Sequence, residues 1–140
     1  MAFPRSSGIL LHPTSLPGPY GIGELGPEAF QFIDFLFEAG QSLWQVLPLG
    51  PTGYGDSPYA SFSAFAGNPL LISPDLLEKD GLLSRKDLKT LPSFPETYVE
   101  YGDVIPFKTK LLHKAYETFN ADASSGQKVD FERFCNENSS

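Results

Sequence analysis

Residues 27–39, PEAFQFIDFLFEA, predict the element around which the fold is organised. Proline at the first position and Gly40 after the last are typical of the two ends of a helix. The polar residues recur every three to four positions in one narrow stripe, so we expect the rest of this helix to be buried. On either side lie short apolar runs, GILLH at 8–12 and LWQVL at 43–47, each stopped by a proline. Both runs predict buried strands.

A strand, a helix and a second strand in this order predict an α/β unit. A crossover of this length joins two parallel, adjacent strands, with right-handed connection as the rule. Trp44, in the second strand, is expected in the core because an indole buries much surface, and its N–H needs a hydrogen-bond partner.

The composition shifts near Leu70, and the rest of the chain predicts mainly helix. A short helix over 73–81 has serine at its cap and glycine at its end. Ser84 and Asp87 resemble a capping arrangement for a second short helix. The prolines and tyrosines of 90–103 indicate an extended connection, and apolar residues at steps of four predict a helix from about Pro106. Residues 120–127 predict a polar loop, and the apolar spacing of 129–135 is helical.

The loop 50–69, GPTGYGDSPYASFSAFAGNP, combines rings with short polar groups. A pyranose has an apolar C–H face and a belt of hydroxyls, so its site needs flat aromatic faces beside hydrogen-bonding groups. The rings are Tyr54, Tyr59, Phe62 and Phe65, and the polar partners are Asp56, Ser57, Ser61, Ser63 and Asn68. This loop predicts a sugar-binding surface.

Charge and composition exclude several other classes of partner. Ten Lys and Arg against 17 Asp and Glu give a net charge of −7, which repels phosphate backbones and argues against nucleic acid. No apolar run approaches a membrane span, and the start of the chain has no hydrophobic signal core. The single Cys135 fits a reducing compartment, so we expect a soluble cytoplasmic protein. One Cys and two distant His cannot build a zinc site, and no metal or other cofactor is expected.

Residues 21–26, GIGELG, spell the glycine pattern of dinucleotide-binding proteins, but the context fails. That pattern needs its first glycine near the strand end and an acidic residue about 20 positions further on. Neither is present here, so glycines that let a loop turn and enter a helix are the favoured interpretation. His12 follows the first strand with no nucleophile or acid in the same motif, and a hydrogen-bonded loop histidine is favoured over a catalytic one.

Three blocks together resemble one known family: LLHPTSLPGPYG at 10–21, WQVLPL at 44–49, and the loop 50–69. In order and spacing they are similar to the amino-terminal region of amylomaltases, which are 4-alpha-glucanotransferases. The resemblance implies a (β/α)₈ barrel with insertions, which needs about 250 residues. We therefore expect an incomplete barrel. Residues 1–70 would hold its first βαβ unit and the substrate loop, and 71–140 would hold part of a mainly helical insertion, with the remainder of the barrel missing.

The resemblance also implies the chemistry and its ligands. The family transfers α-1,4-glucan segments between maltooligosaccharides with retention, which requires two carboxyl groups about 5 Å apart. Those groups lie on later strands of the family, so no residue here is assigned a catalytic role and the isolated chain is expected to be inactive. Ser57 and Tyr59 match residues lining the cleft at the cleaved bond, and Tyr54 and Tyr101 match a second glucan-binding groove.

The sequence leaves alternatives open for the type of protein, for two of its tyrosines and for its location. The chain could be a free-standing carbohydrate-binding module in which Tyr54, Tyr59 and Tyr101 bind sugar without a barrel. Tyr54 or Tyr101 could simply pack a turn, and a plastid setting competes with the cytoplasm.

Overall fold

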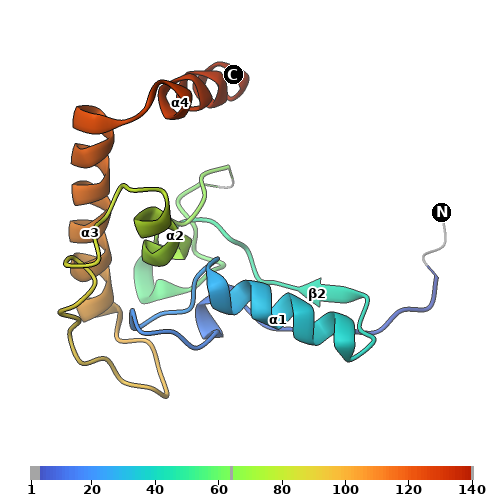
Figure 1. Ribbon diagram of the computed structural model, residues 1–140. Helices are drawn as coiled ribbons and strands as arrows, with labels where there is room; N and C mark the ends of the chain where they lie inside the picture. The colour runs from blue at the N-terminus through green and yellow to red at the C-terminus, as the bar shows by residue number, and fades with distance from the viewer. Residues whose placement is uncertain (1–3, 64, 140) are drawn as a thin grey trace.

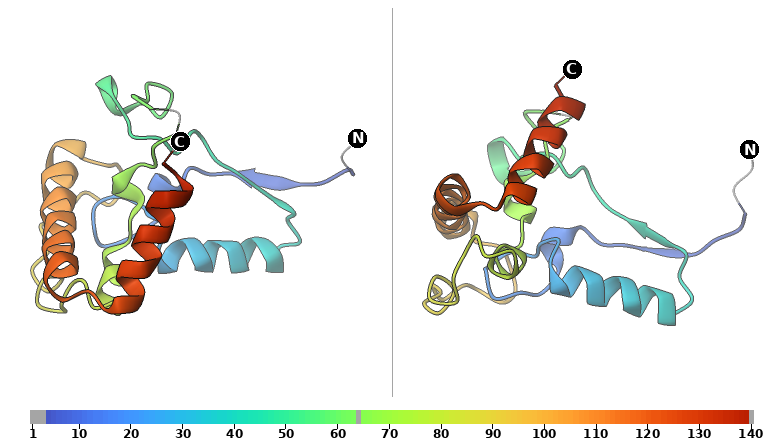
Figure 2. Two further views of the ribbon diagram at one scale, coloured as in Figure 1. Left: turned by 90° about the horizontal axis from the view of Figure 1, so that it is seen from above. Right: turned by 45° about the horizontal axis from the view of Figure 1, so that its top comes forward.

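The computed structural model describes residues 4–63 and 65–139. Figure 1 shows an elongated arrangement, with a strand and helix unit towards one end, a long helix α3 at the other, and a last helix α4 that leaves the end of α3 at an angle. The same separation is seen in the two further views of Figure 2. Among the described residues, none of the helices combines the length and the hydropathy that a membrane-spanning helix needs.

The amino-terminal unit is β1 (Gly8–Leu10), α1 (Pro27–Glu38) and β2 (Leu43–Gln45). The two strands pair in parallel, with Ile9 opposite Trp44, and this confirms the predicted parallel, adjacent strands. The helix also begins at its predicted proline. A Cβ atom on Gly8 would lie only 2.4 Å from the carbonyl oxygen of Leu43, so the close approach of the strands requires glycine there.

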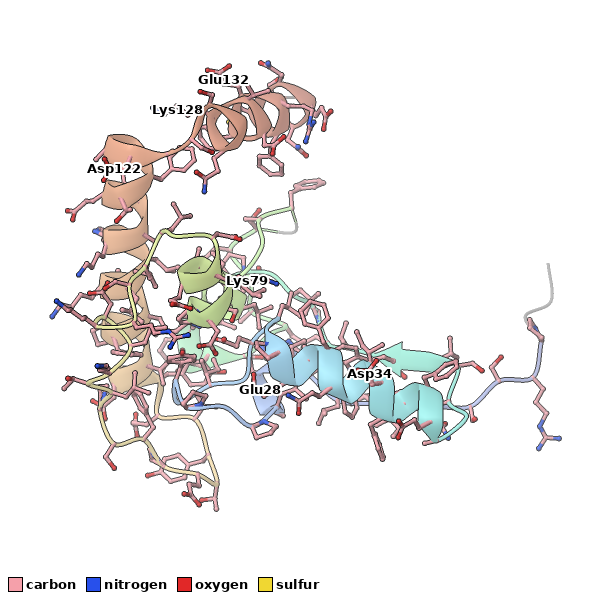
Figure 3. All side chains as sticks on the ribbon, in the orientation of Figure 1. Glu28, Asp34, Lys79, Asp122, Lys128 and Glu132 are labelled. Carbon is pink, nitrogen blue, oxygen red and sulfur yellow. The ribbon has the colours of Figure 1, made fainter. Side chains whose placement is uncertain are left out.

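The expected burial of this unit is wrong. Only Ala29 and Leu36 of α1 are buried, and both strands alternate between exposed and half-buried residues. The large exposed side chains are Leu10, Phe30, Ile33, Phe35, Phe37 and Leu43. The physical reason is that each strand has one neighbour in the described chain. Helix α1 contacts this small sheet along one face, as at Phe32 and Trp44, and the described chain leaves its other side chains exposed. In Figure 3 the polar side chains of Glu28 and Asp34 extend from the same helix.

Trp44 is half-buried instead of lying in a closed core. Its ring meets Phe32 edge-on with centroids 5.1 Å apart. Its indole Nε1 donates a hydrogen bond of 2.7 Å to the carbonyl oxygen of Leu11, which supplies the partner that the sequence required.

The closed core lies elsewhere, against α3 (Tyr101–Asp122). One cluster joins Ile22, Leu70 and Val104, with Phe94, Val99 and Tyr101 packed around it. A second joins Leu83, Leu111 and Ala115 beneath α2 (Pro74–Lys79). The first cluster brings together residues from both sides of position 70.

Three carboxy-terminal predictions need correction. Helix α3 begins at Tyr101, inside the expected extended segment, because the Glu100 side chain accepts a hydrogen bond from the Gly102 N–H and caps it; Pro106 lies within the helix and does not start it. Ser84 and Asp87 form a hydrogen-bonded turn, not a helix.

The polar loop predicted over 120–127 is also wrong, because α3 ends at Asp122 and α4 (Ser125–Glu137) begins three residues later. Ser124 and Gln127 form a capping box, in which each side chain accepts a hydrogen bond from the other residue's backbone N–H. These polar residues therefore start a helix, and the helical spacing of 129–135 is confirmed.

Candidate functional site: a ring-bearing loop beside a cleft

The loop 50–67 leaves the end of β2 and is closed at its base. The Asn68 N–H donates to the carbonyl oxygen of Leu49 (2.9 Å), and the Gly53 N–H donates to that of Ala60 (2.8 Å). An antiparallel bridge between Thr52 and Ser61 reinforces this closure. The loop is thus a hairpin-like projection whose two ends are fixed to the same part of the fold.

The tip of the loop is a tight turn over Tyr54–Asp56. Gly55 and Asp56 both have positive φ, 72° and 52°, a conformation that glycine adopts freely and aspartate tolerates better than most residues. The Ser57 hydroxyl then accepts a hydrogen bond of 3.3 Å from the Tyr59 N–H. Ser57 and Tyr59 are therefore adjacent in one turn, as their spacing in the sequence predicts.

The aromatic rings of this loop are mostly exposed to solvent. Tyr54 is 97% exposed, Tyr59 73%, Phe62 83% and Phe65 100%. Grouped exposed rings of this size mark interaction surfaces, and flat rings beside hydroxyl and carboxylate groups suit the two kinds of surface on a sugar. The Tyr54 ring, 97% exposed, makes little packing contact with the described residues.

His12, at the base of the loop, has partners for both ring nitrogens. Its Nδ1 accepts from the Thr14 N–H (3.3 Å) and lies 2.7 Å from the Thr14 hydroxyl, while Nε2 lies 3.4 Å from the carbonyl oxygen of Pro48. Since Nδ1 accepts a backbone N–H, the proton belongs on Nε2. The histidine links the ends of both strands, which matches its structural interpretation.

Tyr101 lies in a different setting, as the first residue of α3. It is half-buried and lines a cleft of about 840 Å³ between residues 14–23 and residues 94–99. Burial raises the pKa of the Tyr101 phenol, the Asp56 carboxylate raises it further, and the Thr14 hydroxyl partly offsets these effects.

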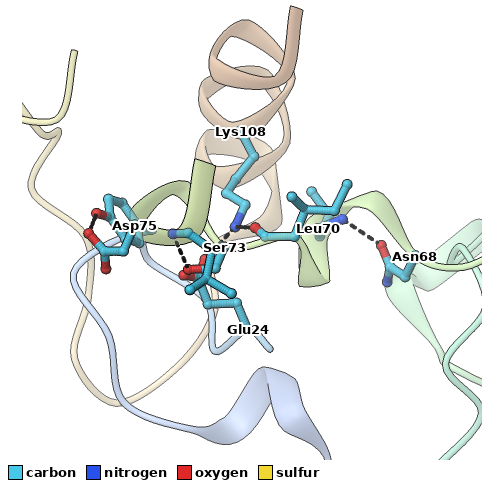
Figure 4. Close-up of polar contacts among 9 residues, drawn as sticks. Glu24, Asn68, Leu70, Ser73, Asp75 and Lys108 are labelled. Carbon is cyan, nitrogen blue, oxygen red and sulfur yellow. Dashed lines mark hydrogen bonds and ion pairs between the residues drawn. The ribbon is translucent and has the colours of Figure 1, made fainter. Parts of the chain in front are cut away.

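The sequence gives no sign of a buried ion pair that lies next to the cleft-lining Gly23, between Glu24 and Lys108. Lys108 is fully buried, and its Nζ donates to Glu24 Oε2 (2.5 Å) and to the carbonyl oxygen of Ile72 (2.7 Å). Figure 4 shows Lys108 descending from α3 towards Glu24, with Ser73 and Asp75 alongside. Nothing in the sequence pairs two residues 84 positions apart.

Burial dominates the electrostatics of this pair. It raises the pKa of Glu24 and lowers that of Lys108, in each case opposed by the attraction between the two charges. Nearby, the Tyr20 hydroxyl donates to Asp75 (2.6 Å), and burial together with this bond raises the pKa of Tyr20. These bonds tie the glycine-rich residues 20–26 to α2 and α3.

The glycines of 21–26 serve this packing. Gly21 has φ +76°, and a Cβ atom on Gly23 would lie 2.1 Å from the carbonyl oxygen of Pro13. The carboxylate of Glu24, at the centre of the motif, forms an ion pair with Lys108. The glycines therefore permit tight turns and close approach, as favoured from the sequence. Across residues 4–63 and 65–139, no group of His, Cys, Asp and Glu is arranged to hold a metal ion.

The comparison with known proteins agrees with this arrangement. Residues 11–140 match the 4-alpha-glucanotransferase family profile, and the chain belongs to that family. It is 53% identical over 134 residues to the 4-alpha-glucanotransferase of Thermus thermophilus, covering 96% of this chain and 26% of the relative. A Solanum tuberosum relative, named 4-alpha-glucanotransferase, chloroplastic/amyloplastic, is 51% identical over 115 residues, which cover 79% of this chain and 20% of the relative.

A solved structure is similar as well. The amylomaltase of Streptococcus agalactiae in complex with acarbose superposes with a TM-score of 0.88 at 41% identity, covering 96% of this chain and 27% of that one. The chain thus spans about a quarter of the length of these relatives, in their amino-terminal portion.

Proposed function

We propose that this chain is the amino-terminal segment of a 4-alpha-glucanotransferase that transfers α-1,4-glucan segments between maltooligosaccharides with retention. The observation that carries the proposal is the base-closed loop 50–67, which presents exposed rings at the carboxyl ends of two parallel strands. Ligand groups of α/β barrels occupy that end of the strands. The activity belongs to the whole enzyme, in which other segments supply the paired carboxylates.

The βαβ unit is then the first unit of a (β/α)₈ barrel. Its exposed apolar side chains on α1, β1 and β2 support this assignment, since later strands and helices would cover them. In this proposal residues 1–70 start the barrel and 71–140 belong to a mainly helical insertion packed against it through the cluster around Val104. The cytoplasm is the proposed location, with a plastid as the alternative that the potato relative represents.

Within the proposed enzyme, Ser57 and Tyr59 contact the donor sugar beside the cleaved bond. Their shared turn orients the ring, and Pro58 restricts the backbone between them. Tyr54 and Tyr101 hold glucan in a second groove; the almost fully exposed ring of Tyr54 and the place of Tyr101 in the lining of the cleft support this assignment.

A chimera tests the assignment of Tyr59. This chain replaces the matched region of the Thermus thermophilus relative, and transfer from maltotriose is measured. Tyr59→Ala removes a stacking face and one hydroxyl, a loss of about 1–3 kcal/mol in transition-state stabilisation and so roughly 10- to 100-fold in rate. Tyr116→Ala, an exposed tyrosine on α3, is the matched control. Equal rates for Tyr59→Ala, Tyr116→Ala and the parent chimera would refute the contact.

The free-standing carbohydrate-binding module is the second candidate, favoured by the same exposed rings. Incubation of the isolated chain with maltotriose, followed by chromatography, is expected to give no longer or shorter maltodextrins. Reproducible products would overturn the proposal that the chain lacks the catalytic carboxylates. The activity of the chimera distinguishes a part of a transferase from an independent module.

A further inference from the structure

The cleft between residues 14–23 and residues 94–99 is large enough for sugar units and is lined by a further exposed ring, that of Tyr98. Its volume of about 840 Å³ lies in the range of small-molecule sites. We propose that it is an additional α-glucan subsite that extends the groove at Tyr101, with Tyr98 as its stacking residue. The identity of the ligand rests on the proposed function; the site itself rests on the geometry of the cleft.

The floor of the cleft is held in a fixed shape. Gly21 lies so close to Phe94 that a Cβ atom there would be 2.5 Å from the ring, and Phe94 in turn meets Phe107 of α3 edge-on, with centroids 5.4 Å apart. On the other wall, the Gly23 N–H donates to the carbonyl oxygen of Thr14 (3.0 Å). Because both walls pack on the core around Val104, a ligand would meet a preformed site and lose less entropy on binding.

The lining offers both surfaces that a pyranose needs. The rings of Pro17 and Pro19 are exposed on one wall, and the Tyr98 ring, 60% exposed, is on the other. Glu96 and Thr97, beside Tyr98, add exposed oxygen atoms that can accept hydrogen bonds from hydroxyls. Apolar faces for C–H groups and oxygen acceptors for hydroxyls therefore occur in one cavity.

The charges around the cleft select among ligands of this size. The Glu96 carboxylate lines it, and none of its lining residues is Lys or Arg. Phosphorylated or carboxylated ligands are disfavoured by these charges, whereas a neutral polyhydroxyl chain is compatible with them. Since Tyr98 precedes Tyr101 by three residues along the same wall, one glucan chain can contact both rings.

Calorimetric titration of the 140-residue chain with maltoheptaose and with maltose tests the proposal. For Tyr98→Ala we expect about tenfold weaker binding of maltoheptaose, because one stacking face is lost, and a smaller change for maltose. Tyr116→Ala is the control, since Tyr116 is similarly exposed but lies outside the cleft. Tyr54→Ala reports separately on the groove of the proposed function.

The outcomes separate the two proposals. If Tyr98→Ala binds maltoheptaose as tightly as wild type while Tyr54→Ala binds it more weakly, the subsite at Tyr98 is refuted and the groove at Tyr54 and Tyr101 is supported. If wild type does not bind maltoheptaose, the subsite is refuted, because its lining lies entirely in this chain; the groove of the proposed function belongs to the whole enzyme and is tested in the chimera. A second measurement in the chimera avoids dependence on the isolated chain: Tyr98→Ala should raise KM for long donors about tenfold and leave kcat unchanged, and an unchanged KM would refute the subsite.

Discussion

Replacing Lys108 by methionine should loosen the contact between α3 and the glycine-rich loop at residues 20–26. The substitution keeps the length and apolar stem of the side chain but leaves Glu24, which is 2% exposed, without its cation. Removing one partner of a buried ion pair costs about 3–5 kcal/mol. The carbonyl oxygen of Ile72 also loses its donor, which contributes about 1 kcal/mol.

The dominant cost can be worked out from proton uptake by Glu24. Without Lys108 the cheapest response is protonation of the carboxylate, whose ordinary pKa is 4.5. At pH 7 this costs about 3 to 4 kcal/mol, and at pH 5 less than about 1 kcal/mol. A carboxyl group with a raised folded pKa favours the folded state below its unfolded pKa and loses that contribution as pH rises. The defect of Lys108→Met should therefore grow between pH 5 and pH 7.

Hydrogen exchange is the appropriate assay, because protection factors of the α3 amides report local opening without requiring a two-state transition. We expect protection near residue 108 to fall about 100-fold at pH 7, or to the unprotected limit, and much less at pH 5. Lys110→Met, an exposed position on the same helix, is the matched control. The double variant Lys108→Met/Glu24→Met should recover most of the protection, since an apolar pair of similar volume replaces the charges. A double variant as weak as Lys108→Met would refute the reasoning that the unpaired charge is the cause.

Three other outcomes are expected. The Lys114 ammonium and the hydrogen bonds from Ser84 hold the pKa of Asp87 at about 2. The ion pair that links Asp87 to Lys114 of α3 is therefore fully present above pH 3.8 and is lost as pH falls towards 2. In an NMR titration, Lys114→Ala should raise the pH midpoint of the Asp87 carboxyl. Gly21→Ala should destabilise the core by about 1 kcal/mol or more, because φ is +76° and a phenylalanine ring occupies the Cβ position, while Gly126→Ala in α4 should not; equal thermal unfolding temperatures would contradict this. Phe37, 83% exposed on α1, should promote self-association of the isolated chain, so Phe37→Ser should lower its light scattering; unchanged scattering would assign the association to another surface.

Local signals in the sequence predicted the βαβ unit well, since the proline and glycine that bound α1 and the prolines after each apolar run act within a few residues. Burial could not be predicted in the same way. The apolar residues of α1 have the pattern of a buried helix, yet Phe37 is mostly exposed because burial depends on what else packs there. The sequence predicts a later start for α3 because Pro106 is the stronger local signal for a helix start. The weaker signal, Glu100, is the residue that caps the helix.

The candidate site was predictable to the extent that it is contiguous in sequence. Ser57 and Tyr59 share one turn, so composition and spacing were enough to place them together. The cleft at Tyr98 and the Lys108–Glu24 pair depend on contacts between distant segments. No periodicity encodes such contacts, and a single lysine in a helix resembles any solvated charge.

Because the loop 50–67 is closed at its base, the residues that hold its fold differ from the residues that its tip presents to solvent. Its ends are fixed by the hydrogen bond from Asn68 to Leu49, so the cost of closing the loop depends little on the residues at its tip. Tip side chains such as Tyr54 contact solvent and contribute little to the core. In the proposed enzyme, substitutions there would change contacts with the ligand with small effects on folding, which would make this loop a suitable place to vary specificity by design or by natural selection.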